Sequence, residues 1–240
     1  MTTDTRCLTA FDVGAFADAN RGAAMAAADP FGADSLALPV SAGPCEVGTV
    51  TFAAGPGNGT ESRGDVLVLV LSGTLTLRDG DTAVDLGAGE AAGIARGTDF
   101  AWSAEEEAVA VFLRYPNETS NTPGITAIDN DAPLAPSNPP AAEVLLSEVP
   151  QCRANNMFVS ADTALKCGVW DSTPYQRVAI HCHHTELMHL LEGSVTFVDA
   201  EGTSRTYSAG DTILLERGAD ATWDSRTNVA KIYATWRTPA

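Results

Sequence analysis

The sequence predicts an all-β protein made of two similar β-rich units in tandem. Short apolar or alternating runs recur along the chain and are bounded by Gly, Asp, Ser or Asn, which is the pattern of short strands between tight turns. The 240 residues include 21 glycines and 13 prolines, and both residue types favour turns. In addition, residues 45–115 resemble residues 167–236 at an offset of 120, which rises to 121 after one inserted residue. We therefore expect one structural unit to be used twice.

The internal repeat preserves the order of its turn-forming residues. The matched positions are Gly48 and Gly168, Gly73 and Gly193, Asp79 and Asp199, Ala88-Gly89 and Ala209-Gly210, Arg96-Gly97 and Arg217-Gly218, and Trp102 and Trp223. Matched glycines are informative because a tight turn selects glycine through backbone sterics. The two tryptophans recur at one repeat position, which favours a packing role for both.

The expected elements follow the chain in order. The first unit, residues 1–115, contains an Ala-rich piece at 21–28 that favours a helical turn, and then expected strands at 66–71, 74–78 and 109–114. Residues 116–143 are rich in Pro and Asn, so we interpret them as a connector with one edge strand at 124–129. The second unit, residues 144–240, has expected strands at 187–191, 194–198, 212–215 and 230–235.

Charge and composition exclude several classes of partner. The chain has 14 Lys and Arg against 31 Asp and Glu, a formal net charge of −17. Such a surface repels phosphate backbones and anionic lipid headgroups, so we expect no nucleic-acid and no membrane partner. No apolar stretch approaches the ~20 residues that a membrane helix needs. The first residues, MTTDTRCLTAFDV, lack the basic start and apolar run of a signal peptide.

The cysteines indicate a reducing compartment. There are five, at Cys7, Cys45, Cys152, Cys167 and Cys182, without any C-x-x-C pair. An odd number at wide spacing argues against a disulfide framework or a four-cysteine zinc site. We therefore expect a soluble cytoplasmic protein.

All four histidines lie within nine residues, in the segment HCHHTELMHLLEG. They are His181, His183, His184 and His189. On a strand, His181 and His183 would share a face, Cys182 would point away from them, and His184 would turn away from His183. Glu186 opens the next apolar strand. Two imidazoles and a carboxylate are suitable ligands for Mn, Fe, Ni or Zn. The alternative is a group of exposed or structurally hydrogen-bonded histidines.

This segment and the residues that follow it resemble a known family. The order is His-x-His, Glu186, Gly193, Gly210-Asp211 and Arg217-Gly218. It is similar to the two motifs of the cupin superfamily, which are small jelly-roll-type β-barrels. The ending with Trp223 and VAKIYATW resembles the ethanolamine-utilisation cupins and, more distantly, the bicupin ureidoglycine aminohydrolases. Since both repeats share the pattern, the resemblance implies a bicupin of two tandem barrels, with His181, His183 and Glu186 as metal ligands.

Two departures from the family pattern concern the metal. Only His184 and Thr185 separate the His-x-His motif from Glu186, and Ala221 stands where the resemblance places a fourth ligand, a histidine. A fourth ligand would then come from solvent, substrate, or one of His189, Tyr207 and Glu216, and Trp223 would form a wall of the same pocket.

The first unit lacks these ligand types. Glu61, Arg63 and Val66 stand at the positions of His181, His183 and Glu186. Because arginine carries a permanent positive charge, we expect no metal here and interpret this barrel as a structural partner. The alternative is an anion-binding pocket built on Arg63 and Arg96.

Two functions of different classes remain. The first is a metal-dependent enzyme that acts on a small polar metabolite, as a hydrolase, lyase, isomerase or oxygenase. The alternative is a non-catalytic bicupin that binds a small ligand or an assembly partner. In either case we expect the two barrels to pack closely and two chains to associate as a homodimer, since small barrels tend to cover their open sheet edges.

Overall fold

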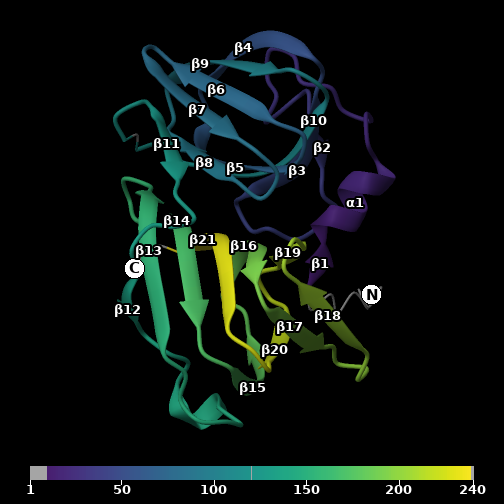
Figure 1. The fold of residues 1–240 in the computed structure, drawn as a ribbon, viewed down its shortest axis with the longest axis vertical. Helices are drawn as coiled ribbons and strands as arrows, with labels where there is room; N and C mark the ends of the chain where they lie inside the picture. Colours follow the sequence, from purple (N-terminus) through teal and green to yellow (C-terminus); the bar gives the residue numbers. More distant parts are fainter. Residues whose placement is uncertain (1–9, 120, 239–240) are drawn as a thin grey trace.

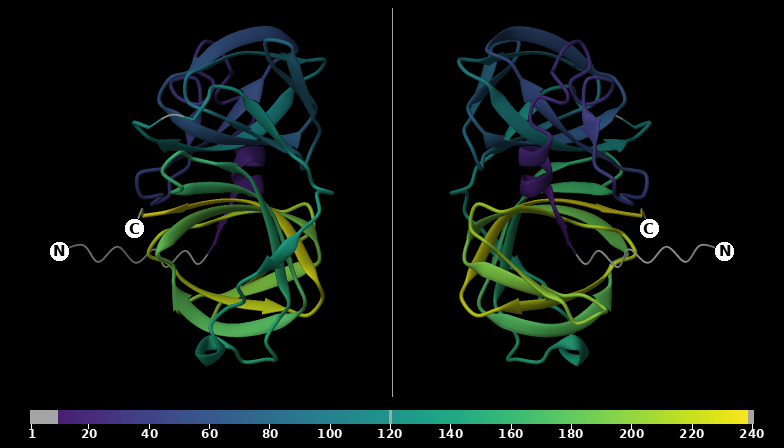
Figure 2. Two further views of the ribbon diagram at one scale, coloured as in Figure 1. Left: turned by 90° about the vertical axis from the view of Figure 1, so that its left-hand side faces the viewer. Right: turned by 90° about the vertical axis from the view of Figure 1, so that its right-hand side faces the viewer.

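The computed structural model describes residues 10–119 and 121–238, which form two β-barrels stacked one above the other (Figure 1). The all-β class and the tandem barrels predicted from the sequence are confirmed. Each barrel combines one large sheet, which faces the other barrel, with a four-stranded outer sheet. Figure 2 shows both barrels from the side.

The first barrel pairs a six-stranded sheet, in the order β11-β8-β5-β10-β3-β2, with the outer sheet β4-β9-β6-β7. Its strands are β2 (Leu36–Ala37), β3 (Glu46–Phe52), β4 (Gly55–Glu61), β5 (Gly64–Ser72), β6 (Leu75–Asp79), β7 (Thr82–Leu86), β8 (Ala91–Ile94), β9 (Thr98–Ala104), β10 (Ala108–Pro116) and β11 (Ile125–Ile128). All the neighbouring strands pair antiparallel.

The second barrel pairs a seven-stranded sheet, β1-β19-β16-β21-β14-β13-β12, with the outer sheet β15-β20-β17-β18. Its strands are β1 (Phe11–Asp12), β12 (Ala135–Ser137), β13 (Cys152–Val159), β14 (Leu165–Ser172), β15 (Tyr175–His181), β16 (His184–Glu192), β17 (Ser194–Val198), β18 (Ser204–Ser208), β19 (Thr212–Leu215), β20 (Asp220–Ser225) and β21 (Val229–Arg237). A short 3-10 helix, η1 (Ala142–Val144), precedes β13.

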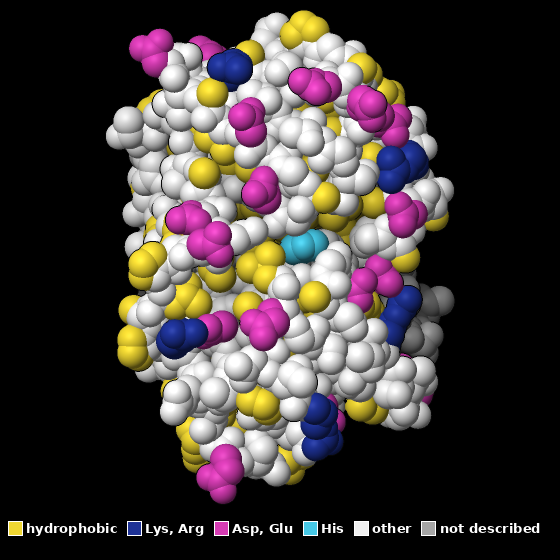
Figure 3. Space-filling model, viewed as in Figure 1, with side chains coloured by type: hydrophobic (Ala, Val, Ile, Leu, Met, Phe, Trp, Pro, Cys, Tyr) yellow, Lys and Arg dark blue, Asp and Glu magenta, His cyan; other side chains and the backbone are white. Residues whose placement is uncertain are grey.

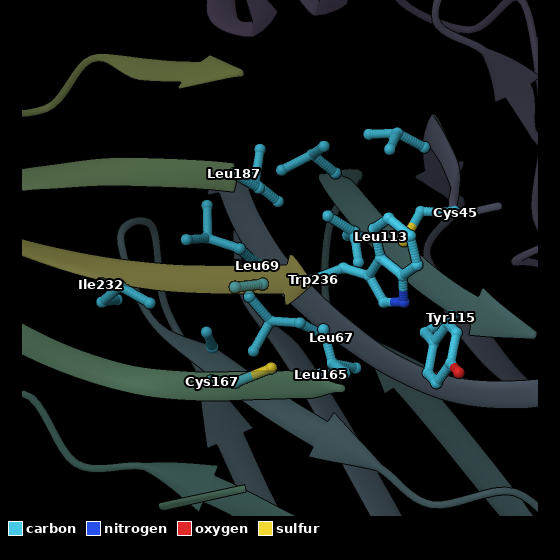
Figure 4. Close-up of a cluster of buried hydrophobic side chains, with 14 of the residues drawn as sticks. Cys45, Leu67, Leu69, Leu113, Tyr115, Leu165, Cys167, Leu187, Ile232 and Trp236 are labelled. Carbon is cyan, nitrogen blue, oxygen red and sulfur yellow. The ribbon is translucent and has the colours of Figure 1, made fainter. Parts of the chain in front are cut away.

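The interface between the barrels is an apolar core of its own (Figure 4). Leu67 and Leu69 of β5 meet Leu165, Leu187 and other side chains of the second barrel there. The alternate residues of β5 face the interior of the first barrel instead, which explains why residues 66–71 of this strand are all apolar. Each fully buried leucine contributes about 1.5–3 kcal/mol. The predicted close packing of the barrels is therefore confirmed.

Segments at both ends of the first unit also join the barrels. Strand β1 pairs with β19 of the second barrel, although it precedes the first barrel in the chain. In the connector, β11 pairs with β8 and β12 pairs with β13, so this segment runs along both barrels (Figure 2). The edge strand expected at 124–129 is confirmed as β11. The division at residues 1–115, 116–143 and 144–240 stays a prediction.

The repeat glycines have a clear structural role. Gly73 and Gly193 occupy the same turn of each barrel with φ of 79° and 75°. A Cβ atom would lie 2.5 Å from the Glu107 carbonyl oxygen at Gly73 and 2.0 Å from the Asn228 carbonyl oxygen at Gly193. Both conformation and space therefore demand glycine, and this is why the repeat preserves it.

The predicted helical turn at residues 21–28 is wrong. That segment forms turns, bends and one bridge, whereas the helix α1 (Val13–Ala19) lies just before it. The Asp12 carboxylate accepts a hydrogen bond from the Ala15 amide at 2.8 Å and so caps this helix. The N-cap at Asp12 determines where the helix begins, and the alanine content of residues 21–28 is not sufficient to form a helix there.

The predictions on cysteines, membrane helices and surface charge concern the chain as a whole. Within the described residues, Cys45, Cys152, Cys167 and Cys182 are free and buried, and Cys7 lies outside the described residues together with most of the N-terminal stretch tested for a signal peptide. Among the helices of the described chain, none is long and apolar enough to cross a membrane. Acidic side chains are spread over both barrels on the face shown in Figure 3.

Candidate functional site

The predicted ligands His181 and His183 lie at the exposed end of β15. Their ring centroids are 5.0 Å apart. His181 is about half exposed, and its Nδ1 lies 3.1 Å from Oδ1 of Asp220. Strand β15 carries a register shift between Arg177 and Ile180, which interrupts the alternation of inward and outward side chains. The two imidazoles therefore meet at the surface and not inside the barrel.

Glu186 lies inside the second barrel, in a different environment. Its Oε1 accepts a hydrogen bond from Lys231 Nζ at 2.9 Å, and its Oε2 lies 3.4 Å from Nε2 of His184. Burial raises the pKa of this carboxyl, but the Lys231 ammonium and the His184 imidazole outweigh burial and hold the pKa well below its usual range. The carboxylate therefore remains ionised and is already paired with a cation of its own chain.

The Lys231 ammonium is enclosed by groups that favour a cation. The side chain is only 7% exposed. Its Nζ lies 2.9 Å from the Met188 sulfur, 4.9 Å from the centroid of the Trp170 ring and 5.3 Å from that of Trp223. Aromatic faces attract cations at such distances. Lysine and Glu186 thus form a buried ion pair between β21 and β16.

The histidine that lies beside Glu186 is His184, which was not among the predicted ligands. Residues 184, 186 and 188 share the inward face of β16 because they alternate along one strand. His183 belongs to the turn before this strand, so the alternation counted from His181 does not continue through it. The i, i+2 spacing of His184 and Glu186 was the signal available, and a lysine within the apolar run VAKIYATW was the signal for Lys231.

Three ligands do not converge on a metal position in this geometry. Within residues 10–119 and 121–238, no group of three or more His, Cys, Asp or Glu side chains is placed to hold a metal ion. Ala221, at the position of the fourth ligand, is fully buried, and its carbonyl accepts a hydrogen bond from the guanidinium of Arg177. A divalent cation does not fit beside Glu186, because the Lys231 ammonium already lies 2.9 Å from its Oε1. The site of His181, His183 and Glu186 remains a prediction.

The four further residues predicted for the same pocket do not share one. His189 lies on the opposite face of β16, and its Nδ1 is 2.8 Å from the Thr212 hydroxyl. Burial lowers the pKa of this imidazole. Tyr207 is buried in the outer sheet, and Glu216 accepts a hydrogen bond from the Ser41 amide at 2.7 Å. Of the four, only Trp223 is close to Lys231.

Trp223 and Trp102 have the packing role predicted for them. Trp223 stacks on Tyr175 with ring centroids 5.5 Å apart, and its Nε1 donates to the Ser225 hydroxyl. Trp102 is 6% exposed and meets the edge of Phe52. Both tryptophans therefore fill the interiors of their barrels. Cys182 is also buried in the second barrel, and burial raises the pKa of its thiol, as expected for an unreactive cysteine.

The first barrel holds a buried charge cluster at the corresponding end. Arg114 on β10 is 1% exposed, and its Nε and Nη2 donate to Oε2 of Glu61 at 3.1 and 2.9 Å. Its Nη1 donates to Glu46 Oε2 at 2.8 Å, and Nη2 lies 3.5 Å from Asp29 Oδ1. Arg63 pairs with the other oxygen of Glu46. The sequence did not predict the role of Arg114, because its partners come from distant segments.

Two cavities open beside this cluster. One, of about 400 Å³, is polar and is lined by Asp29, Asn58, Thr60, Ser62, Arg63 and Arg114, among others. The other, of about 320 Å³, is lined mainly by apolar side chains and again by Arg63. Arg96 lines neither of them, because it donates to the Ser62 carbonyl at 3.0 Å and to the Asn117 carbonyl. Arg63 and Arg96 therefore do not form a common anion site. Val66 is fully buried in the barrel core.

Comparison with known proteins identifies the family. EutQ-like cupin domains match residues 159–233. A Pseudomonas syringae pv. tomato protein of unknown function, from the DUF861 family, shares 36% sequence identity over 82% of this chain and 83% of its own, with a TM-score of 0.76. The chain belongs to the cupin superfamily. At that identity and coverage, it also belongs to the same cupin family as the Pseudomonas protein.

More distant cupins share the fold alone. A cupin 2 conserved barrel domain protein from Leptotrichia buccalis is 9% identical, with a TM-score of 0.53, over 85% of this chain and 90% of its own. No curated protein matches the sequence.

Proposed function

We propose that this cupin is a non-catalytic bicupin that binds a small polar metabolite without a metal ion. The observation that carries the proposal is the 2.9 Å contact between Lys231 Nζ and Glu186 Oε1 inside the second barrel. A divalent cation at Glu186 would lie beside a buried ammonium, and the low-dielectric interior makes that repulsion large. Lys231 supplies the positive charge that a bound metal ion supplies in a metal-binding barrel.

The first barrel supports the binding part of the proposal. The two cavities beside the Arg114 cluster, of about 400 and 320 Å³, have the size of ordinary small-molecule sites, about 300–1,000 Å³. The polar cavity is lined by the charged residues Asp29, Arg63 and Arg114, and the fully buried Arg114 is itself fixed by ion pairs with Glu46 and Glu61. Fixed charges beside a cavity are what a binding site needs in order to orient a small polar ligand.

A metal titration tests the proposal. The purified protein is incubated separately with Mn²⁺, Fe²⁺, Ni²⁺ and Zn²⁺, desalted and analysed for bound metal, with the Glu186→Gln and His183→Ala variants in parallel. We expect metal content well below one ion per chain and the same for all three proteins. A content near one ion per chain that falls in both variants would refute the proposal.

The second candidate is a metal-dependent cupin enzyme that acts on the same class of metabolite. It is favoured by one observation, the close approach of His181 and His183 at the rim of the second barrel. Two neutral imidazoles at this distance are able to share a metal ion with solvent or substrate. Turnover of a metabolite that is lost on chelation and restored by one of the four metals would establish this candidate.

A further inference from the structure

The two cavities beside the Arg114 cluster share one side chain. Arg63, on the turn after β4, lines both the polar cavity and the apolar one. Its guanidinium is paired with Glu46, and its side chain is 49% exposed. An exposed ion pair of this kind contributes little stability, so Arg63 can exchange Glu46 for a ligand at small cost.

Glu46 does not become unpaired when Arg63 turns away. Its second oxygen keeps the hydrogen bond from Arg114 Nη1 at 2.8 Å. Arg114 itself is committed to the protein, since its guanidinium also donates twice to Glu61. The positively charged group free to bind a ligand is therefore Arg63, and Arg114 supports the carboxylates around it.

Asp29 provides the opposite charge in the polar cavity. Its side chain is 42% exposed, and its Oδ1 has only the 3.5 Å contact with Arg114. Its Oδ2 accepts the Ala33 amide at 3.0 Å, which fixes the orientation of the carboxylate. Asp29 and Arg63 thus present a carboxylate and a guanidinium to the same cavity.

The adjoining cavity selects for an apolar group. Its wall includes Phe31, Leu38, Val40, Val47 and Phe112, and the carboxylate of Glu46 lines it next to Arg63. Apolar surface buried there gains about 25 cal/mol per Å². A ligand that fills both spaces therefore has an apolar body next to the polar group that meets Arg63.

The net charge of the cluster favours a zwitterionic ligand over an anionic one. The cluster contains the guanidiniums of Arg63 and Arg114 and the carboxylates of Asp29, Glu46 and Glu61, so negative charge is in excess by one. The whole chain carries −17, which repels an anionic ligand. A zwitterion satisfies both Arg63 and Asp29 without adding net charge.

We infer that the first barrel binds an α-amino acid with an apolar side chain. The ligand carboxylate pairs with Arg63, the ammonium group pairs with Asp29, and the side chain enters the apolar cavity. This inference rests on the proposed ligand-binding function and assigns its site and ligand class.

Isothermal titration calorimetry of the full-length protein tests the inference. The probes are L-leucine, 4-methylpentanoate, which lacks the ammonium group, 3-methylbutylamine, which lacks the carboxylate, and L-aspartate. We expect L-leucine to bind and each of the other three to bind roughly tenfold or more weakly, because a hydrogen bond to a charged group is lost or a charge is added. Absence of L-leucine binding would overturn the inference.

Variants identify the groups that bind. Arg63→Gln is expected to weaken L-leucine binding roughly tenfold, because the ligand carboxylate no longer has a partner. In this variant the affinity for L-leucine should equal the affinity for 3-methylbutylamine. Asp29→Asn is likewise expected to weaken L-leucine binding, and in this variant the affinity for L-leucine should equal the affinity for 4-methylpentanoate. Arg153→Gln, which breaks the exposed pair with Asp171 in the other barrel, is the control and leaves binding unchanged. Unaltered binding in both test variants would refute the site.

The same protein preparation is analysed for metal and examined by circular dichroism. A metal-poor, folded protein without leucine binding overturns the ligand assignment and leaves the metal-free proposal intact. A protein with one metal ion per chain overturns the proposed function, whatever the calorimetry shows.

Discussion

Replacing Lys231 with methionine tests the buried ion pair directly. The side chains of Lys231 and Glu186 are 7% and 14% exposed, so the remaining carboxylate would be buried with only His184 beside it. Breaking a buried pair in this way costs about 3–5 kcal/mol. For a chain of this length, about 2–4 °C of Tm corresponds to 1 kcal/mol, so we expect Tm to fall by roughly 6–20 °C.

The pH dependence of this loss has a defined sign. In the native protein the pKa of Glu186 lies below its unfolded value, so the pair stabilises the fold above the unfolded pKa and is lost as pH falls through the folded one. Without the ammonium, burial raises this pKa, and protonation removes the buried charge. The Tm difference between the Lys231→Met variant and the native protein should therefore become smaller as the pH falls and Glu186 of the variant is protonated.

A double variant completes the test. Lys231→Met combined with Glu186→Leu removes both charges, and replacing a buried pair with apolar groups is often close to neutral. We expect Tm to recover much of the loss in differential scanning calorimetry. If the single variant leaves Tm unchanged, or if the two substitutions are additive, the ion pair is not the interaction described here.

Three further predictions concern other parts of the molecule. Arg114→Met leaves Glu61 buried without its cation, so thermal unfolding should show a loss of stability of about 3–5 kcal/mol. The control Arg153→Met should change stability by less than about 0.5 kcal/mol. Equal losses in the two variants would contradict the role of the cluster. Gly193→Ala should destabilise the fold far more than Gly202→Ala in urea unfolding, because both have positive φ but only the first would place a Cβ atom against a carbonyl oxygen; similar effects would contradict this. Light scattering should give twice the 24.9 kDa mass of one chain, and the mass of a single chain would refute the homodimer.

The architecture was predictable because its determinants are local. The turn at Gly193 forces one residue type through backbone sterics, and the same constraint at Gly73 made the repeat visible. The uninterrupted apolar run of β5 likewise follows from a strand that is buried on both faces. Such features appear in the sequence at the positions where they act.

The ion pairs and side-chain contacts inside the barrels were not predictable in the same way. A register shift in β15 places His181 at the surface, and this shift has no local sequence signature. Lys231 meets Glu186 across two strands that are 45 residues apart in the chain. Arg114 joins carboxylates from three separate segments. These pairings depend on strand register and on the closure of the barrel, and both are properties of the whole fold.

We propose that Lys231 takes the place of a metal ion in the second barrel. The most direct test is a crystal structure of the protein grown with an excess of Mn²⁺ or Zn²⁺ and measured at the absorption edge of the metal. We expect no anomalous peak within bonding distance of Glu186, and we expect the Lys231 ammonium at hydrogen-bond distance from its carboxylate. An anomalous peak bound by His181, His183 and Glu186, with Lys231 displaced, would contradict it.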